Sequence, residues 1–151
     1  MTIGRFVSDL EEGDILESVV YVLSPFMVRE YCRGAGEHAE SFHGPSVDGS
    51  EPQQVPPTLI HIDKFRLLDR TCPGGPGPNA RIHYEYHATH HRPVPIGEQL
   101  RASGRVARRY ERRGRQYLEI EIDLRVHATG ELLTTYRDTA LLAYKITGPT
   151  Q

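Results

Sequence analysis

The chain has 151 residues, the size of one domain, with 38% hydrophobic residues, 25% charged residues and a formal net charge of -2. This composition excludes an intrinsically disordered chain, and the slight acidity argues against a general nucleic-acid binder. The two cysteines have neither a metal-type nor a disulfide-type spacing. Because the sequence contains no recognisable signal peptide and no long apolar run, we expect a cytoplasmic protein that does not insert into membranes.

The first two predicted elements are a strand over residues 15–23 and a helix over about 25–34. Ser24 is suited to cap this helix, and Pro25 suits its first position because proline lacks the N–H that would stay unpaired there. Gly36 tolerates the left-handed backbone that ends a helix. An apolar stripe should face the core, and it consists of Met27, Val28, Tyr31, Cys32 and Ala35.

A cluster of ionisable side chains directly follows this helix. Glu37, His38, Glu40 and His43 lie close together in the sequence. A histidine can exchange protons near neutral pH, and a carboxylate can orient it or hold a water molecule, so this segment is the candidate for acid–base chemistry. A solvated loop after a helix is the alternative interpretation of the same residues.

A segment rich in Gly, Pro, Ser and Gln covers 44–57 and leads to a second predicted helix near 57–69. Pro57 suits the start of this helix. Its broad apolar surface is formed by Leu59, Ile60, Ile62, Phe65, Leu67 and Leu68, whereas Asp63, Lys64 and Arg66 indicate that it is not buried on all sides.

From Ile82 onward the apolar residues alternate with polar ones, which is typical of half-buried strands. After the strand that starts at Ile82, we predict strands over 99–109, 118–126 and 132–146, with hairpin turns at Gly114 and Gly130. Helices on one side of a curved antiparallel sheet make an α+β domain. The second helix should pack on the concave sheet face, formed by Tyr84, Tyr86, Ile120, Ile122 and Leu124. Because such a sheet has free edges, we also expect a dimer.

Glu85 shares one face of a predicted strand with three histidines, His83, His87 and His91. This spacing suits metal ligands, but alternating polar residues are also typical of a solvent-facing sheet surface. The sequence adds no further ligand signature, so we expect neither a metal nor another cofactor.

Positive charge is concentrated on one predicted hairpin, which carries Arg101, Arg105, Arg108, Arg109, Arg112, Arg113 and Arg115. These side chains would attract phosphate groups or an acidic protein surface. Nucleic-acid binding would require more interleaved aromatic residues than Tyr110 and Tyr117. The alternative is an arginine-rich hairpin that merely keeps a sheet edge soluble.

Three segments of the sequence resemble the MaoC-like branch of the hot-dog superfamily, and more narrowly the amino-terminal dehydratase-type half of that branch. They are VREYCRGAGE at 28–37, VPPTLI at 55–60, and the stretch from HRPVPIGEQL to GELL at 91–133. Together with the element order they cover about 20–146. The resemblance implies a single MaoC-like hot-dog domain over 1–151, in which a curved antiparallel sheet wraps around a central helix.

Members of this family hydrate or dehydrate acyl thioesters on coenzyme A or an acyl carrier protein, using the acid–base motif Gly-Asp-x-Asn-Pro-x-His. In this sequence Gly36 and Glu37 stand at Gly-Asp, Phe42 stands at the histidine position, and His43 follows one residue later. The resemblance implies that Glu37 and His43 are catalytic. It implies a set of substrate-binding residues, namely Gly36, His38, Pro57, Thr58, Arg108, Arg109, Arg112 and Arg113, where helix-end N–H groups near Pro57 would stabilise the thioester oxygen.

Three functions stay open at this point. The first is a hydratase or dehydratase acting on an enoyl or 3-hydroxyacyl thioester, a lyase of fatty acid or polyketide metabolism. The second is a non-catalytic hot-dog subunit that binds an acyl thioester or completes a heterodimer with a catalytic MaoC-like chain. The third is a hot-dog thioesterase in which a carboxylate activates water. We expect an acyl-CoA or acyl-carrier-protein thioester as ligand, a homodimer or heterodimer, and neither a nucleic-acid nor a membrane partner.

Overall fold

The structure is a computed structural model that describes residues 4–36, 54–77 and 80–144. This part of the chain consists of one β-sheet and the helices that pack beside it. In chain order the elements are η1 (Val7–Asp9), β1 (Ile15–Val22), α1 (Pro25–Ala35), η2 (Pro57–His61), α3 (Ile62–Thr71), β2 (Ala80–His90), β3 (Gln99–Arg112), β4 (Arg115–Val126) and β5 (Leu132–Tyr144), where η denotes a 3₁₀ helix.

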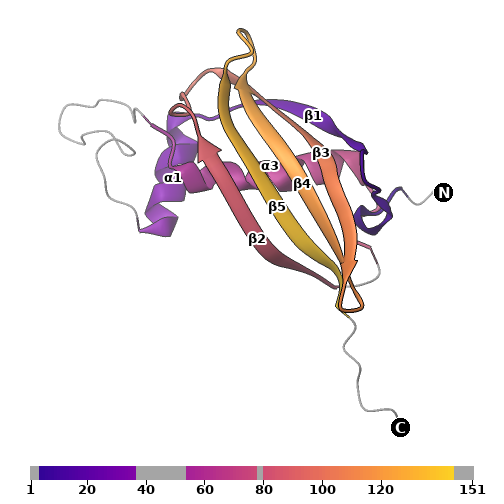
Figure 1. The fold of residues 1–151 in the computed structure, drawn as a ribbon. Helices are drawn as coiled ribbons and strands as arrows, with labels where there is room; N and C mark the ends of the chain where they lie inside the picture. The colour runs from indigo at the N-terminus through magenta and orange to yellow at the C-terminus, as the bar shows by residue number, and fades with distance from the viewer. Residues whose placement is uncertain (1–3, 37–53, 78–79, 145–151) are drawn as a thin grey trace, which may run out of the picture.

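The five strands form one antiparallel sheet in the order β1-β3-β4-β5-β2. The meander of β3, β4 and β5 agrees with the prediction from the sequence, and β2 joins it beside β5 rather than beside β3. The sheet curves around α3, and α1 lies against one end of it (Figure 1). The predicted α+β architecture, a curved antiparallel sheet wrapped around a central helix, is confirmed.

The two predicted hairpin turns are present. Arg113 and Gly114 both adopt left-handed backbone angles, with φ of 51° and 74°, between β3 and β4. A two-residue turn of this kind follows the twist of the strands it joins. Gly130, with φ of 74°, serves the β4–β5 hairpin and donates its N–H to the carbonyl of Val126 at 2.8 Å.

Helix α1 begins and ends close to the predicted positions. The Ser24 hydroxyl accepts a hydrogen bond from the N–H of Met27 at 3.2 Å. Gly36 ends the helix with φ of 73°. The buried stripe is narrower than predicted, because only Val28 and Cys32 are fully buried while Met27 is 39% exposed. Tyr31 is half-buried, and Ala35 is exposed.

The predicted second helix is present, but it consists of two parts. Its first turn, η2, is a 3₁₀ helix in which Leu59 donates its N–H to the carbonyl of Pro56 at 3.0 Å. The paired prolines explain this entry, since Pro57 disfavours the α conformation at the preceding residue and supplies no N–H of its own. The α-helical part continues to Thr71, slightly beyond the predicted end.

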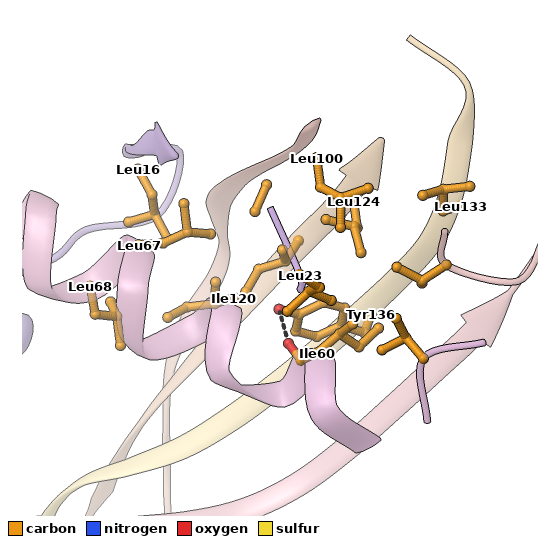
Figure 2. Packing of buried hydrophobic residues seen from close by; sticks show 14 of the residues in the cluster. Leu16, Leu23, Ile60, Leu67, Leu68, Leu100, Ile120, Leu124, Leu133 and Tyr136 are labelled. Atoms are coloured by element: carbon orange, nitrogen blue, oxygen red, sulfur yellow. Dashed lines mark hydrogen bonds between the residues drawn. The ribbon is translucent and has the colours of Figure 1, made fainter. Parts of the chain in front are cut away.

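The core lies between α3 and the concave face of the sheet (Figure 2). Ile120, Ile122 and Leu124 of β4 are at most 2% exposed, as predicted, and they face Leu67 of the helix layer. The Tyr136 hydroxyl reaches across this core and donates a hydrogen bond to the carbonyl of Ile60 at 3.3 Å (Figure 2). This contact fixes the start of the central helical segment to β5.

The prediction that Tyr84 lies on the concave, helix-covered face of the sheet was wrong. Tyr86 packs partly against the core, whereas Tyr84 is 54% exposed. The β2–β5 register shifts between His83 and Glu85, and β2 is the last strand of the sheet. An irregularity of this kind re-aims the neighbouring side chain, and an edge strand leaves it uncovered.

Gly104 of β3 allows the helix to approach the sheet closely. A Cβ atom at this position would lie 3.1 Å from Leu67 Cδ1 and 3.2 Å from Ile122 Cγ1. Even the smallest side chain would therefore push against both layers.

No helix in the described ranges is long and apolar enough to cross a bilayer.

Candidate functional site

The described framework of the candidate site is the contact between α1 and η2. The hydroxyls of Tyr31 and Thr58 lie 2.6 Å apart and share a hydrogen bond. Gly36 closes α1 immediately before the segment that carries the motif residues. Glu37, His38 and His43 lie outside the described residues, so their positions remain sequence-based expectations.

A pocket of about 310 Å³ opens where η2 meets the end of β2, and a volume in this range suits a small-molecule ligand. Pro57, one of the predicted substrate-binding residues, lines it. The other lining residues are Gln54, Val55, His90, His91, Arg92, Pro93 and Val94. The pocket therefore combines apolar walls with two imidazoles and a guanidinium group.

Backbone and side-chain contacts hold the β2 side of this pocket in place. His91 and Arg92 both direct their N–H groups to the carbonyl of Leu133, at 2.8 and 3.2 Å. The Arg92 guanidinium forms an ion pair with Glu131 at 2.5 Å. His90 Nδ1 lies 3.4 Å from the Thr134 hydroxyl. These contacts tie the end of β2 and the residues that follow it to β5 and the turn before it.

A buried ion pair lies under the start of α3. Lys64 Nζ lies 2.8 Å from Asp138 Oδ1, and both side chains are at most 7% exposed. The second carboxylate oxygen of Asp138 faces His83 Nε2 at 3.4 Å. His83 is 49% exposed, so Asp138 connects a buried ammonium group to an imidazole at the sheet edge.

Asp63 is a second buried carboxyl group, and it is completely inaccessible to solvent. Burial raises its pKa to about 6, and the Tyr21 hydroxyl and the Arg66 guanidinium lower that pKa only in part. Arg66 lies over the Tyr21 ring at 3.9 Å. Tyr21 is close enough to influence the carboxyl electrostatically, yet neither group completes a hydrogen bond within the described residues.

His61 borders this polar interior at the end of η2. Its ring lies against that of Tyr86, with the centroids 3.8 Å apart. Partial burial lowers the pKa of His61, and the nearby Asp138 offsets this only in part. Burial also raises the pKa of Tyr86, to about 12. A neutral imidazole and a neutral phenol therefore stand side by side at physiological pH.

The arginine-rich hairpin does not act as one uniform patch. Arg109 donates hydrogen bonds to the carbonyls of Ser8 and Leu10 at 2.7 and 2.6 Å, which ties the amino-terminal segment to β3. Arg108 is exposed and lies over the Tyr110 ring, 4.7 Å from its centroid. A structural role thus accounts for Arg109, whose guanidinium is committed to backbone carbonyls.

Arg112 and Arg113 instead line a cavity of about 380 Å³ at the hairpin end of the sheet. Tyr84, Arg115 and Tyr117 complete its lining. Sequence reasoning missed this pairing of tyrosines because Tyr84 lies on β2 and Tyr117 on β4, two strands that are distant in sequence. It also missed the pocket role of His90 and Arg92, although the dense run HATHHRP at 87–93 was a visible signal.

The histidines of β2 do not converge on a common point. His87 Nε2 pairs with Glu85 at 2.6 Å, whereas His83 faces Asp138. Within the described ranges, no group of three or more His, Cys, Asp or Glu side chains is arranged to hold a metal ion.

No protein-family model and no curated protein matches the chain. Several solved structures share its architecture. The HadBC (3R-hydroxyacyl-ACP dehydratase) complex from Mycobacterium tuberculosis matches with a TM-score of 0.71 at 18% identity, over 86% of this chain and 96% of that one. The R-hydratase PhaJ1 from Pseudomonas aeruginosa matches with a TM-score of 0.70 at 12% identity, over 94% and 88%.

A MaoC-like dehydratase from Rhodospirillum rubrum matches with a TM-score of 0.64 at 16% identity, over 95% of this chain and 100% of that one. The chain has the hot-dog fold. In this hot-dog domain α3 is the central helix, and the fold expected from the resemblance is confirmed. Because the identities are low, the likeness concerns the fold, and the activity has to be argued from the chain's own residues.

Proposed function

We propose that this hot-dog protein, as a MaoC-like single domain over 1–151, hydrates or dehydrates an acyl thioester by acid–base chemistry. The observation that supports the proposal is the contact between α1 and η2. The left-handed Gly36 ends α1 directly before the motif segment in the sequence, and α1 is tied to η2 by the hydrogen bond between Tyr31 and Thr58. A pocket of about 310 Å³ opens beside η2. The proteins of similar fold include enzymes named as an (R)-hydratase and a 3R-hydroxyacyl-ACP dehydratase.

Dehydration of a 3-hydroxyacyl thioester requires a base for the proton next to the carbonyl and an acid for the departing hydroxyl group. We assign proton transfer to His43 and the binding of water or hydroxyl to Glu37. The C–H electrons form the new double bond, and the protonated hydroxyl leaves as water. Hydration is the reverse reaction.

The negative charge that develops on the thioester oxygen requires a hydrogen-bond donor. Pro57 has no N–H, and the N–H of Leu59 is already bonded to Pro56. We therefore assign the backbone N–H of Thr58 to this role. The Tyr31 contact holds the Thr58 side chain and so orients this turn.

Purified protein assayed with enoyl and 3-hydroxyacyl thioesters tests the proposal. His43→Ala and Glu37→Gln should each reduce kcat by roughly a hundredfold or more while KM changes little. His87→Ala is the matched control, since this exposed histidine of β2 pairs with Glu85 on the same strand and its loss should leave turnover unchanged. Full activity of both motif variants would refute the assignment.

A non-catalytic subunit is the second candidate function. The motif departure favours it, because Phe42 stands where the family has its histidine. Two proteins of similar fold are described as complexes, HadBC and ChsH1-ChsH2 from Mycobacterium tuberculosis, the latter with a TM-score of 0.66 at 12% identity. A wild-type chain that is inactive alone but restores activity to a catalytic partner, regardless of His43→Ala, would support this function. The third function, thioester hydrolysis, is tested in the same assay by following release of the free thiol.

We further propose that two hot-dog chains associate through β2. This strand is a free edge of the described sheet, and Ile82 and Tyr84 on it are 42% and 54% exposed. Pairing of two β2 edges would satisfy their backbone groups and cover these side chains.

A further inference from the structure

The last residue of β2, His90, brings an imidazole to the pocket beside η2. The strand ends at the side of the sheet where α1 and η2 lie (Figure 1). The His90 side chain lines the pocket of about 310 Å³ together with Pro57. Thr58, whose N–H we assign to the thioester oxygen, directly follows Pro57. An imidazole and the proposed oxygen-binding turn therefore border the same pocket.

A buried hydroxyl group orients the ring of His90. His90 of β2 and Thr134 of β5 are paired in the sheet, and His90 Nδ1 lies 3.4 Å from the Thr134 hydroxyl. Thr134 is 0% exposed, whereas His90 is exposed, so the hydroxyl is fixed in the interior while the ring reaches outward from it. When Nδ1–H donates to this oxygen, Nε2 is the nitrogen that exchanges a proton with the pocket.

The contact with Thr134 also separates His90 from the proposed pairing of two chains. β5 is the inner neighbour of β2, so this contact turns the ring away from the free edge of the sheet. Ile82 and Tyr84, which the pairing would cover, lie near the opposite end of the strand Ala80–His90. The imidazole is therefore available to the pocket in a paired chain.

The charges around His90 permit a proton on its ring. Arg92, two residues further on, is committed to Glu131 at 2.5 Å. Burial lowers the pKa of His61 of η2, Asp138 opposes this in part, and the imidazoles of His83 and His90 and the Lys64 ammonium group add to the lowering. Because His61 is neutral at physiological pH, it does not repel a positive charge on His90.

The proposed dehydration has a use for a second imidazole. Elimination of water requires a base for the proton next to the carbonyl and an acid for the departing hydroxyl group. The family motif departs here at its histidine position, where this chain has Phe42, and His43 follows one residue later. His43 is assigned to take the first proton, so the source of the second one remains to be named.

We propose that His90 is the general acid of this site and that Thr134 is its positioning residue. The inference deepens the proposed function and rests on it. As His43 takes the proton next to the carbonyl, the C–H electrons form the double bond and the C–O bond breaks. Its electron pair leaves with the hydroxyl group, which receives the proton of His90 Nε2 and departs as water. His43 then releases its proton to solvent and His90 regains one.

The assignment is tested first with 3-hydroxyacyl thioesters. His90→Gln should lower kcat roughly a hundredfold with little change in KM, because it removes the proton donor and keeps a polar side chain. It should also abolish the decline of kcat at alkaline pH, which in the wild type reports loss of the acid's proton. His87→Ala, an exposed histidine on the same strand that pairs with Glu85, is the control and should behave as the wild type.

A 3-chloroacyl thioester separates the acid role of His90 from a structural one. Chloride leaves as an anion and needs no proton, so wild type and His90→Gln should eliminate it at equal rates. His43→Ala should slow elimination from both substrates, since both lose the proton next to the carbonyl.

Thr134→Val keeps the shape of the buried side chain and removes the hydroxyl group that orients His90. It should lower kcat severalfold on the hydroxyacyl substrate alone and shift the alkaline decline, and Thr134→Ser should restore both.

The outcomes distinguish this inference from the proposed function. An active wild type with unchanged turnover in His90→Gln, an alkaline decline that this variant retains, or an equal loss on both substrates would overturn the acid assignment alone. A wild-type chain that turns over neither substrate would refute the proposed function, and the acid assignment with it.

Discussion

The buried pair Lys64–Asp138 gives the sharpest test of the described interior. Lys64→Met keeps most of the side-chain length and removes the charge, so Asp138 loses the partner at 2.8 Å. At an effective dielectric constant near 20, the attraction at this distance is about 6 kcal/mol. Desolvation offsets part of it, and removal of one partner from a buried pair costs about 3–5 kcal/mol.

The remaining neighbour cannot replace Lys64. His83 lies 3.4 Å from the other carboxylate oxygen and is half exposed. A loss of 3–5 kcal/mol is a large share of the roughly 5–15 kcal/mol that stabilises a domain. It should lower Tm by on the order of 10 °C for a chain of this size.

Urea unfolding followed by circular dichroism measures the free energy of unfolding. Arg105→Met is the matched control, because Arg105 pairs with Glu121 at 3.1 Å but is 53% exposed, and its loss should cost less than about 1 kcal/mol. The double variant Lys64→Met/Asp138→Leu should recover most of the stability, since apolar replacement of a whole buried pair is often neutral. A loss below 1 kcal/mol for Lys64→Met alone would refute the reasoning.

Three further predictions concern Asp63, Ile122 and the β2 edge. Burial raises the pKa of Asp63 in the folded state from 3.8 to about 6, so the stability associated with the protonated carboxyl is complete below pH 3.8 and is lost as the pH rises through 6. Asp63→Asn should therefore raise the free energy of unfolding at pH 7 by up to about 3 kcal/mol and flatten its dependence on pH between 4 and 6, as denaturation at several pH values would measure; an unchanged pH dependence would contradict this. Ile122→Asp should prevent folding, because Ile122 is 0% exposed in the core, and a cooperative unfolding transition in this variant would show that the core has been misjudged. Light scattering at micromolar concentration should give a multiple of 17.1 kDa, and a monomer mass would count against pairing through β2.

Periodicity predicted the parts of the fold in which local sequence decides the outcome. The alternation of Ile120, Ile122 and Leu124 identified the buried face of β4, and Ser24 and Gly36 marked both ends of α1. These signals work because each depends on a residue's own backbone preference or on its immediate neighbours.

The misses arise from contacts between segments that are distant in sequence. Tyr84 has the alternation of a core residue, but a register shift and an edge position expose it. The contacts of Arg109 with the carbonyls of Ser8 and Leu10, about a hundred residues earlier, likewise have no signal in the local sequence. The arginine cavity depends equally on the pairing of β2, β5 and β4, which no local pattern encodes.

In the candidate site, too, the residues placed by local sequence were predicted, and those placed by the position of β2 were not. Pro57 was predicted at the start of the second helix, where its own chemistry favours it, and in that position it lines the pocket. His90 and Arg92 reach the same pocket only because β2 ends beside η2, a tertiary arrangement.

The hydrogen bond between Tyr31 and Thr58 makes the chain between them a closed loop whose two ends are set by the domain itself. Closure entropy grows only with the logarithm of loop length, and doubling the length costs about 0.6 kcal/mol. A change in the length of the chain between these anchors should therefore cost the rest of the domain little. The two anchors thus divide the domain into a framework whose register is fixed and a connection whose length that framework does not prescribe.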